Sequence, residues 1–371
     1  MKIAMLGHKR IPSREGGIEI VVGELSRRMA AMGHSVTAYN RKSRHIAGSE
    51  FDEKRKKEFE GVNLKWVYTP DNAKLNAIVY SFFATLGASL KKFDVIHFHA
   101  EGPSSMVPLA KLFRKRCVVT VHGLDWQRAK WGGFATRYLL FGEKCAAKYA
   151  DEIIVLSKNV QNYFLEKYGR ETVFIPNGIS KPERKNADII RRKYGLEKDG
   201  YILFLGRLVP EKGIHYLINA YKALNTDKKL VIAGGASHTS EYEKELKELA
   251  GENESIIFTG FVQGEELDEL YSNAFIYCLP SDLEGMPISL LEAMSYGNCC
   301  VTSDIEECTE VCEDNAVYFS KGDENALKQA LISLLENPTK IEKLKNSSAE
   351  FILNKYNWDD VASRTLELYK K

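Results

Sequence analysis

Two glutamates eight residues apart, Glu284 and Glu292, flank a segment that predicts an anion-binding turn. The apolar run 275–279 predicts a strand that ends before Glu284, and Pro287 suits the first position of a following helix. The unpaired amides and the positive dipole end of a first helical turn attract anions. A helical stretch 284–292 spans about 12 Å, so its two carboxylates would hold opposite ends of one extended ligand. The alternative is a pair of solvated surface glutamates.

A second loop presents two cations. Arg207 and Lys212 follow the expected strand 201–205 and precede the expected helix 214–224. In open parallel α/β sheets, ligands bind at the carboxyl ends of the strands. The planar fork of an arginine and the point charge of a lysine together suit a diphosphate. The alternative is two loop charges in solvent.

The first half of the chain carries glycines and histidines at corresponding places. Gly16 and Gly17 precede the first expected helix, where they let a ligand approach the backbone or simply form a tight turn. They do not form the Gly-x-Gly-x-x-Gly pattern of a dinucleotide site. His97 and His99 share a face of one expected strand, and they are either site or packing residues. His122 ends the next strand as a neutral hydrogen-bond donor.

The elements that must position these residues alternate between strand and helix, which predicts doubly wound parallel sheets of the α/β class. The pattern restarts after residue 180, giving a first domain 1–180 and a second domain 181–356. An amphipathic helix over 357–371 ends the chain. The expected strands are 2–6, 35–39, 64–68, 95–98, 117–121, 153–156 and 173–175, then 201–205, 229–233, 256–259, 275–279 and 299–302.

Charge is divided unevenly between the two halves. Residues 1–180 hold 29 Lys and Arg against 17 Asp and Glu, whereas the rest hold 23 against 33. A basic first half suits an anionic partner. Its clusters at 41–44, 54–57 and 114–116 predict contact with an anionic membrane surface, the alternative being solvated charge. Basic residues are not interleaved with aromatic ones, so no nucleic-acid partner is expected.

The remaining composition predicts a cytoplasmic protein. The start of the chain does not resemble a signal peptide, and the most apolar window, 75–90, is shorter than a membrane-spanning helix of about 20 residues. Seven cysteines without a Cys-x-x-Cys pair favour buried free thiols, as Cys278, Cys299 and Cys300 illustrate. No metal-ligand spacing is present, so neither a metal nor another cofactor is expected.

Together these residues resemble the family-4 retaining glycosyltransferases, also called group 1, which have the GT-B fold of two Rossmann-like domains facing a central cleft. The resemblance covers nearly the whole chain. Its motifs are Glu284 to Glu292, the Arg207/Lys212 pair, 176–178, the Gly16-Gly17 loop and His122. Segments 7–19 and 122–131 resemble a narrower subgroup of exopolysaccharide and capsule enzymes that includes rhamnosyltransferases. The sequence departs from the family in one place: many members have Phe-Gly after the first Glu, where this chain has Gly-Met.

The resemblance implies a retaining, metal-independent sugar transfer from a nucleotide-diphosphate sugar to a saccharide acceptor carried on a polyprenyl diphosphate. Arg207 and Lys212 would neutralise the departing diphosphate, Glu284 would contact the sugar and Glu292 the ribose. His122 is the fourth expected catalytic residue, touching the donor sugar. The remaining expected substrate contacts are Gly16, Gly17, His97, Asp125, Asn177, Gly206, Gly235, Val262, Gly285, Met286, Pro287 and Ile288.

Two other classes of protein fit the same fold and diphosphate site. A non-hydrolysing epimerase of nucleotide-activated aminosugars would not need a basic first domain and normally lacks the Glu-x7-Glu spacing. A non-enzymatic nucleotide-sugar sensor would bind the donor without hydrolysing or transferring it. The membrane-facing charge and the paired glutamates favour the transferase.

Overall fold

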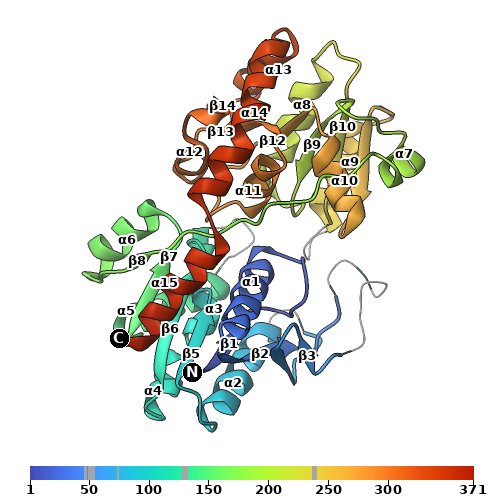
Figure 1. The fold of residues 1–371 in the computed structure, drawn as a ribbon. Helices are drawn as coiled ribbons and strands as arrows, with labels where there is room; N and C mark the ends of the chain where they lie inside the picture. The colour runs from blue at the N-terminus through green and yellow to red at the C-terminus, as the bar shows by residue number, and fades with distance from the viewer. Residues whose placement is uncertain (46–47, 49–54, 73–74, 128–132, 236–239) are drawn as a thin grey trace. The chain divides into compact units, whose positions relative to one another are not determined.

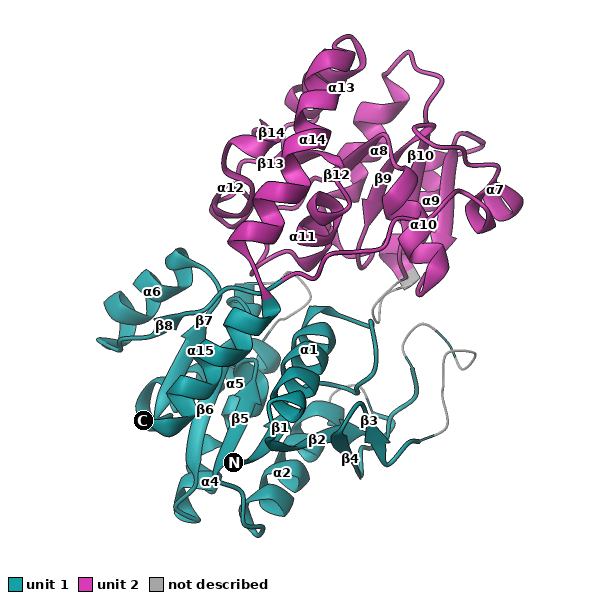
Figure 2. Cartoon of the chain, in the orientation of Figure 1, with its two compact units in different colours: residues 1–178, 358–371 teal, residues 179–357 magenta. Residues whose placement is uncertain are grey.

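The computed structural model describes residues 1–45, 48, 55–72, 75–127, 133–235 and 240–371. The chain forms two compact units (Figures 1 and 2). The first unit comprises residues 1–178 and 358–371, and the second comprises residues 179–357. The C-terminal helix α15 (Trp358–Lys370) therefore belongs to the first unit, where it contacts α1 (Gly17–Ala31).

The first unit is built on a sheet that has eight strands within the described residues, in the order β3-β4-β2-β1-β5-β6-β7-β8. All neighbouring strands are parallel except the short pair β3 and β4. The strands are β1 (Lys2–Leu6), β2 (Ser35–Arg41), β3 (Glu58–Phe59), β4 (Val62–Val67), β5 (Val95–His99), β6 (Arg116–Val121), β7 (Glu152–Val155) and β8 (Val173–Phe174). The other helices are α2 (Asn76–Ser89), α3 (Glu101–Ser104), α4 (Val107–Leu112), the short η2 (Asp125–Gln127), α5 (Phe134–Tyr149) and α6 (Lys158–Tyr168).

The second unit has a sheet of six described strands, all parallel, in the order β11-β10-β9-β12-β13-β14. The strands are β9 (Tyr201–Leu205), β10 (Lys229–Ala233), β11 (Ile256–Gly260), β12 (Ile276–Leu279), β13 (Cys299–Ser303) and β14 (Ala316–Phe319). The helices are α7 (Ile189–Tyr194), η3 (Pro210–Lys212), α8 (Ile214–Lys222), α9 (Ser240–Ala250), α10 (Glu265–Asn273), α11 (Ile288–Ser295), α12 (Glu306–Cys312), η4 (Glu313–Asn315), α13 (Glu324–Leu335) and α14 (Pro338–Lys355).

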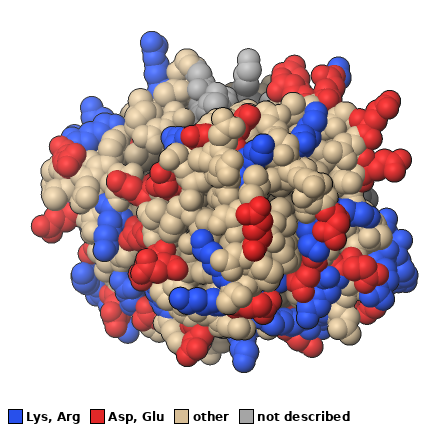
Figure 3. Space-filling view, turned by 90° about the horizontal axis from the view of Figure 1, so that it is seen from above, with Lys and Arg blue, Asp and Glu red and all other residues tan. Residues whose placement is uncertain are grey.

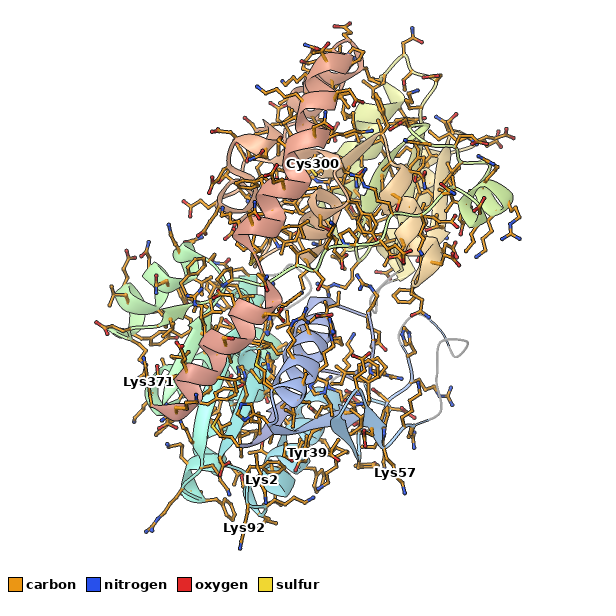
Figure 4. The ribbon with its side chains drawn as sticks, in the orientation of Figure 1. Lys2, Tyr39, Lys57, Lys92, Cys300 and Lys371 are labelled. Atoms are coloured by element: carbon orange, nitrogen blue, oxygen red, sulfur yellow. The ribbon has the colours of Figure 1, made fainter. Side chains whose placement is uncertain are left out.

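These elements form where the apolar runs predict them, because parallel strands covered by helices on both faces are buried along their whole length. All twelve expected strands are present within one or two residues of their predicted bounds, whereas β3 and β14 were not predicted. The cysteines are confirmed as buried free thiols, and Cys300 of β13 lies inside the second unit (Figure 4). Burial raises the pKa of the Cys300 thiol well above its ordinary value, so this thiol stays protonated.

One predicted helix begins a single residue later than expected. Pro287 has extended backbone angles and caps α11, whose first residue is Ile288. Residues 284–287 are therefore a turn, and the separation of Glu284 from Glu292 is not that of eight helical residues. The proline cannot donate a backbone hydrogen bond, so it ends the extended segment without leaving an unpaired amide of its own.

The loops after β9 and β12 touch through a glycine. Gly213 has φ +62°, and a Cβ atom built there would lie 2.0 Å from the carbonyl oxygen of Pro280. Beside this contact, the amide of Asp282 donates a 2.9 Å hydrogen bond to the carbonyl of Glu211. The two loops are thus fixed against each other through backbone atoms, at a distance that only glycine allows.

We expect Gly213→Ala to lower the free energy of unfolding by about 3 kcal/mol or more, because it adds a clash to the left-handed backbone. Gly251→Ala is the matched control, since Gly251 has φ +65° and no atom within 4 Å of a built Cβ. It should cost only about 1 kcal/mol, the left-handed penalty alone. Urea unfolding measures both. Equal losses would mean that the contact with Pro280 is unimportant.

Candidate active site

Two of the predicted catalytic residues meet directly in the second unit. The Nζ atom of Lys212 lies 2.5 Å from Oε1 of Glu284, although the two residues are 72 positions apart in the chain. Lys212 follows β9 and Glu284 follows β12, the neighbouring strands between which the strand order reverses. In doubly wound sheets this reversal is the place where ligands bind.

The Lys212–Glu284 pair is largely removed from solvent. The exposed fractions of the two side chains are 12% and 8%, and Ser281 donates a 2.6 Å hydrogen bond to the same carboxylate oxygen. A lysine in such a position interacts with charge more strongly than one at the surface, where ion pairs contribute little. The alternative of solvated loop charges therefore does not hold for Lys212. Arg207 is half-buried in the same loop.

Glu292 is buried on α11 and held by an aromatic residue. The hydroxyl of Tyr271 donates a 3.1 Å hydrogen bond to its Oε2 atom, and the Tyr271 ring stacks on Tyr296 with centroids 5.3 Å apart. Tyr296 in turn donates to Asp268. The carboxylate is therefore fixed in orientation, and the alternative of a solvated surface glutamate is wrong for Glu292.

The predicted backbone contacts lie at the same edge of this sheet. Gly206, Gly235 and Val262 follow β9, β10 and β11 respectively. The amide of Leu208 donates to the carbonyl of Gly235, which joins the first two of these loops. The predicted contacts that follow Glu284 are all buried, and they comprise Gly285, Met286, Pro287 and, at the start of α11, Ile288. Asn177, also buried, belongs to the first unit.

In the first unit the strand order reverses between β1 and β5, and histidines gather there. Gly7 directly follows β1 and has φ +109°. Its backbone packs so closely against His99 that a built Cβ would lie 2.2 Å from the His99 carbonyl oxygen. Nδ1 of His99 lies 3.0 Å from Nε2 of His122, which is half-buried at the end of β6. Asp125 is half-buried and begins η2. His122 is thus positioned by a buried neighbour.

His97, a predicted substrate contact, is bonded inside the first unit. Its side chain is fully buried, with Nδ1 2.6 Å from the hydroxyl of Tyr369 and Nε2 2.7 Å from Oγ1 of Thr120. Both ring nitrogens are therefore engaged within the unit. His97 ties β5 to β6 and to the C-terminal helix α15, which favours the packing alternative for this residue.

Two buried carboxylates of the first unit, Glu143 and Glu101, were not predicted from the sequence. Glu143 of α5 is fully buried and accepts hydrogen bonds from Trp126, Tyr163, Lys167 and Tyr168. These contacts hold η2 against α6. The available signal was an acidic residue on the apolar face of an expected helix.

Glu101, at the start of α3, is the second of these carboxylates. Burial, together with the nearby charges of Asp125 and Glu143, raises the pKa of Glu101 to about 10. Its carboxyl is therefore protonated at neutral pH and can share a proton with a neighbouring carboxylate.

The Gly16-Gly17 loop is lined by paired charges. Gly16 is extended and caps α1, which begins at Gly17 without a side-chain cap. The preceding Glu15 is buried, and its carboxylate lies 3.4 Å from Nζ of Lys9 and 3.3 Å from Nε of Arg10. These cations are therefore partly neutralised inside the loop.

The predicted basic clusters are only partly surface charge. Arg41 donates hydrogen bonds to the carbonyl of Gly7 and to Asn76, and its guanidinium lies 4.7 Å from the Tyr80 ring centroid. Its assignment to a membrane-facing cluster is wrong. Lys54 of the second cluster lies outside the described residues, as do residues 128–131 of the subgroup motif. Basic and acidic side chains are interspersed over most of the face in Figure 3.

Among the described residues, no group of three or more His, Cys, Asp or Glu side chains is arranged to hold a metal ion. Within the described residues, no helix has the length and hydropathy of a membrane span.

Two Rossmann-like units with parallel sheets and this strand order are the architecture of the GT-B fold. The model of "Glycosyltransferase Family 4" matches residues 15–181, and that of "Glycosyl transferases group 1" matches residues 186–351. An uncharacterized glycosyltransferase of Methanocaldococcus jannaschii, MJ1069, is 30% identical over 280 residues, which are 71% of this chain and 69% of that protein. The chain belongs to the group 1 glycosyltransferases of family 4, which use nucleotide-sugar donors.

Solved structures agree on the fold. Sucrose-phosphate synthase from Thermosynechococcus elongatus superposes with a TM-score of 0.84 at 22% identity, covering 100% of this chain and 98% of that one. HepE from Anabaena, in complex with UDP-glucose, gives a TM-score of 0.79 at 17% identity, covering 99% and 98%. The GT-B fold predicted from the sequence is confirmed.

The buried histidine predicts a pH dependence of stability. Burial, followed by the nearby charge of His122, lowers the pKa of His97 to about 3. Between pH 6.5 and 3 the unfolded chain therefore binds a proton that the folded chain does not, and stability falls as the pH falls. In His97→Gln this fall should be shallower by up to about 1.4 kcal/mol per pH unit.

Unfolding by urea at a series of pH values between 7 and 4 measures this slope. His215→Gln is the control, because His215 is only half-buried beside Tyr242 and should change the slope less. An unchanged slope in His97→Gln would show that His97 is not neutral in the folded protein.

Proposed function

We propose that the protein is a retaining, metal-independent transferase that moves a sugar from a nucleotide-diphosphate sugar to a hydroxyl of a saccharide carried on a polyprenyl diphosphate. The setting would be capsule or exopolysaccharide assembly at the cytoplasmic face of the membrane, as in the rhamnosyltransferase-like subgroup that the sequence resembles. The observation that carries the proposal is the largely buried Lys212–Glu284 pair at the strand reversal of the second unit.

The pair supports a role in leaving-group departure. When a nucleotide diphosphate leaves, charge develops on its oxygens, and a preorganised cation nearby stabilises that charge. Lys212 would move from Glu284 to the diphosphate, with Arg207 from the same loop beside it. The same movement releases the Glu284 carboxylate to accept hydrogen bonds from sugar hydroxyls. Donor binding and exposure of Glu284 are therefore one event in this proposal.

Glu292 would receive the ribose of the donor. Its carboxylate is held by Tyr271, so it loses little side-chain entropy on binding two hydroxyls. The base of the donor nucleotide would contact the main chain at Val262, which follows β11. The UDP-glucose in the HepE complex supports a donor of this chemical class.

Retention of configuration would come from attack on the same face of the sugar from which the diphosphate leaves. The C1–O bond to the phosphate breaks through an oxocarbenium-like state, and the acceptor oxygen forms the new bond to C1. The departing phosphate takes the proton of the acceptor hydroxyl. Closure of the two domains would exclude water, which would otherwise hydrolyse the donor.

The charge of Lys212 predicts a kinetic effect. Lys212→Ala should lower kcat by about 100-fold or more, because it removes one preorganised charge from the leaving group. Lys345→Ala is the matched control, since Lys345 also forms an ion pair in the second unit, with Asp199, away from the strand reversal. Its kcat should stay near that of the wild type. Similar turnover in the two variants, measured as release of nucleoside diphosphate, would contradict the proposal.

A second expectation concerns metal ions. Because cationic side chains supply the charge that Mg²⁺ or Mn²⁺ supplies in other transferases, activity should survive EDTA within about twofold. The measurement is the initial transfer rate after chelation, with and without added Mg²⁺. Loss of activity in EDTA and recovery with the ion would show that Arg207 and Lys212 do not suffice.

A further inference from the structure

Helix α2 buries its small and hydroxyl-bearing side chains and exposes its large apolar ones, which is the reverse of the usual amphipathic arrangement. The side chains that it buries in the first unit are mostly small or hydroxyl-bearing: Tyr80, Ser81, Ala84, Thr85, Ala88 and Ser89. Its outward side chains are large and apolar, with Phe82 and Phe83 both exposed. A surface helix of a soluble domain normally turns its apolar stripe inward and its polar face outward.

The outward stripe is continuous and uncharged. Leu75, Phe82, Phe83 and Leu90 are all exposed. The last three follow Leu75 by seven, eight and fifteen residues, spacings that place all four on one side of a helix. No charged residue occurs between positions 75 and 90. Exposed Tyr68, just after β4, extends the stripe, because its ring lies 6.4 Å from that of Phe83.

The end of α4 adds to the same surface. Leu112 is 81% exposed, and Phe113 beside it is also exposed. Nζ of Lys115 donates a 2.6 Å hydrogen bond to the carbonyl of Lys91, which places this turn next to the end of α2. Helices α2 and α4 are also in contact. We call this the α2–α4 surface, and its apolar members are Leu75, Phe82, Phe83, Leu90, Leu112 and Phe113.

The distribution of exposed apolar side chains favours a function for this surface. Every large hydrophobic residue that is exposed among the described residues lies in the first unit, between Met32 and Leu165. The second unit, of similar size, exposes none in its described part. An apolar surface of this kind in one unit alone marks a place of interaction.

Basic residues border the α2–α4 surface at one end. Lys91, Lys92 and Arg114 are all exposed there, and the side chain of Lys92 projects away from the ribbon in Figure 4. Apolar and aromatic side chains flanked by lysine and arginine are typical of helices that lie in the interface of an anionic bilayer. A twofold pairing with a second copy would bring these like charges together, which disfavours self-association.

We propose that the α2–α4 surface binds an anionic lipid bilayer, with Phe82 and Phe83 entering the boundary between headgroups and acyl chains. This proposal rests on the proposed function for its purpose, which is to bring the enzyme to an acceptor carried on a membrane lipid. It keeps Arg114 of the predicted cluster 114–116, omits the cluster around Arg41, and adds the apolar side chains of α2 and α4. Membrane contact here depends on inserted apolar side chains as well as on charge.

The test is flotation of the purified full chain with vesicles of phosphatidylcholine containing about one third phosphatidylglycerol, without donor or acceptor. We expect the wild type to bind and Phe82→Ser/Phe83→Ser to bind at least about tenfold more weakly, since two apolar side chains are removed from the bilayer. The control is Met32→Ser/Leu165→Ser, which changes two exposed apolar residues outside the surface. It should bind as the wild type does.

Charge is tested by a second pair of variants. Lys91→Glu/Lys92→Glu should weaken binding to the anionic vesicles, and high salt should do the same. Lys321→Glu/Lys343→Glu makes an equal change of charge at exposed positions of the second unit and should have little effect. Equal binding of the wild type to vesicles of pure phosphatidylcholine would contradict the role of these lysines.

Three outcomes would overturn the proposal: no binding by the wild type, binding unchanged in Phe82→Ser/Phe83→Ser, or a wild-type dimer in light scattering that this variant abolishes. The last would make the α2–α4 surface a contact between copies. Because binding is measured without turnover, an inactive protein that binds vesicles counts against the proposed function alone. An active enzyme that transfers sugar to a soluble acceptor but does not bind vesicles counts against this proposal alone.

Discussion

In a parallel sheet all strands end at one edge, and a reversal in strand order leaves two neighbouring strands whose connections leave on opposite sides. In the second unit these strands are β9 and β12, and their following loops are pressed together where Gly213 meets the carbonyl of Pro280. This contact brings Lys212 to Glu284 across 72 residues of chain. The charge pair is therefore a consequence of backbone packing, and its burial follows from the same closeness.

The first unit uses the same topology with different electrostatics. Its reversal lies between β1 and β5, where Gly7 meets the carbonyl of His99 much as Gly213 meets Pro280. Burial lowers the pKa of His99 well below its ordinary value, with the charges of its neighbouring histidines acting in the same direction. His99 is therefore neutral and contacts His122 at this edge, and the charges of the segment that follows β1 are paired through Glu15.

The sequence predicted the strands well because apolar β-branched runs are local signals. It identified Lys212 and Glu284 as site residues because each follows a strand, and it did not predict their contact. The predictions failed for residues whose surroundings are set by partners far away in the chain. His97 is engaged by Tyr369, 272 residues away, and no local pattern reveals that partner. Arg41 belongs to a basic run in the sequence, yet its guanidinium packs over Tyr80. The sequence does not distinguish Glu143 from a surface glutamate on a helix. Only the structure shows that four donors from η2 and α6 bind its buried carboxylate.

For helix α2, too, the local sequence does not determine which side chains are exposed. Its apolar window was too short to span a membrane, and its composition does not say which side faces inward. The sheet decides, because small residues allow close packing: Tyr39 of β2, labelled in Figure 4, donates a 3.3 Å hydrogen bond to the carbonyl of Gly87. Once Ala84 and Ala88 face the sheet, the 3.6-residue period places Phe82 and Phe83 outside. A length that is insufficient for crossing a bilayer is sufficient for lying in its interface.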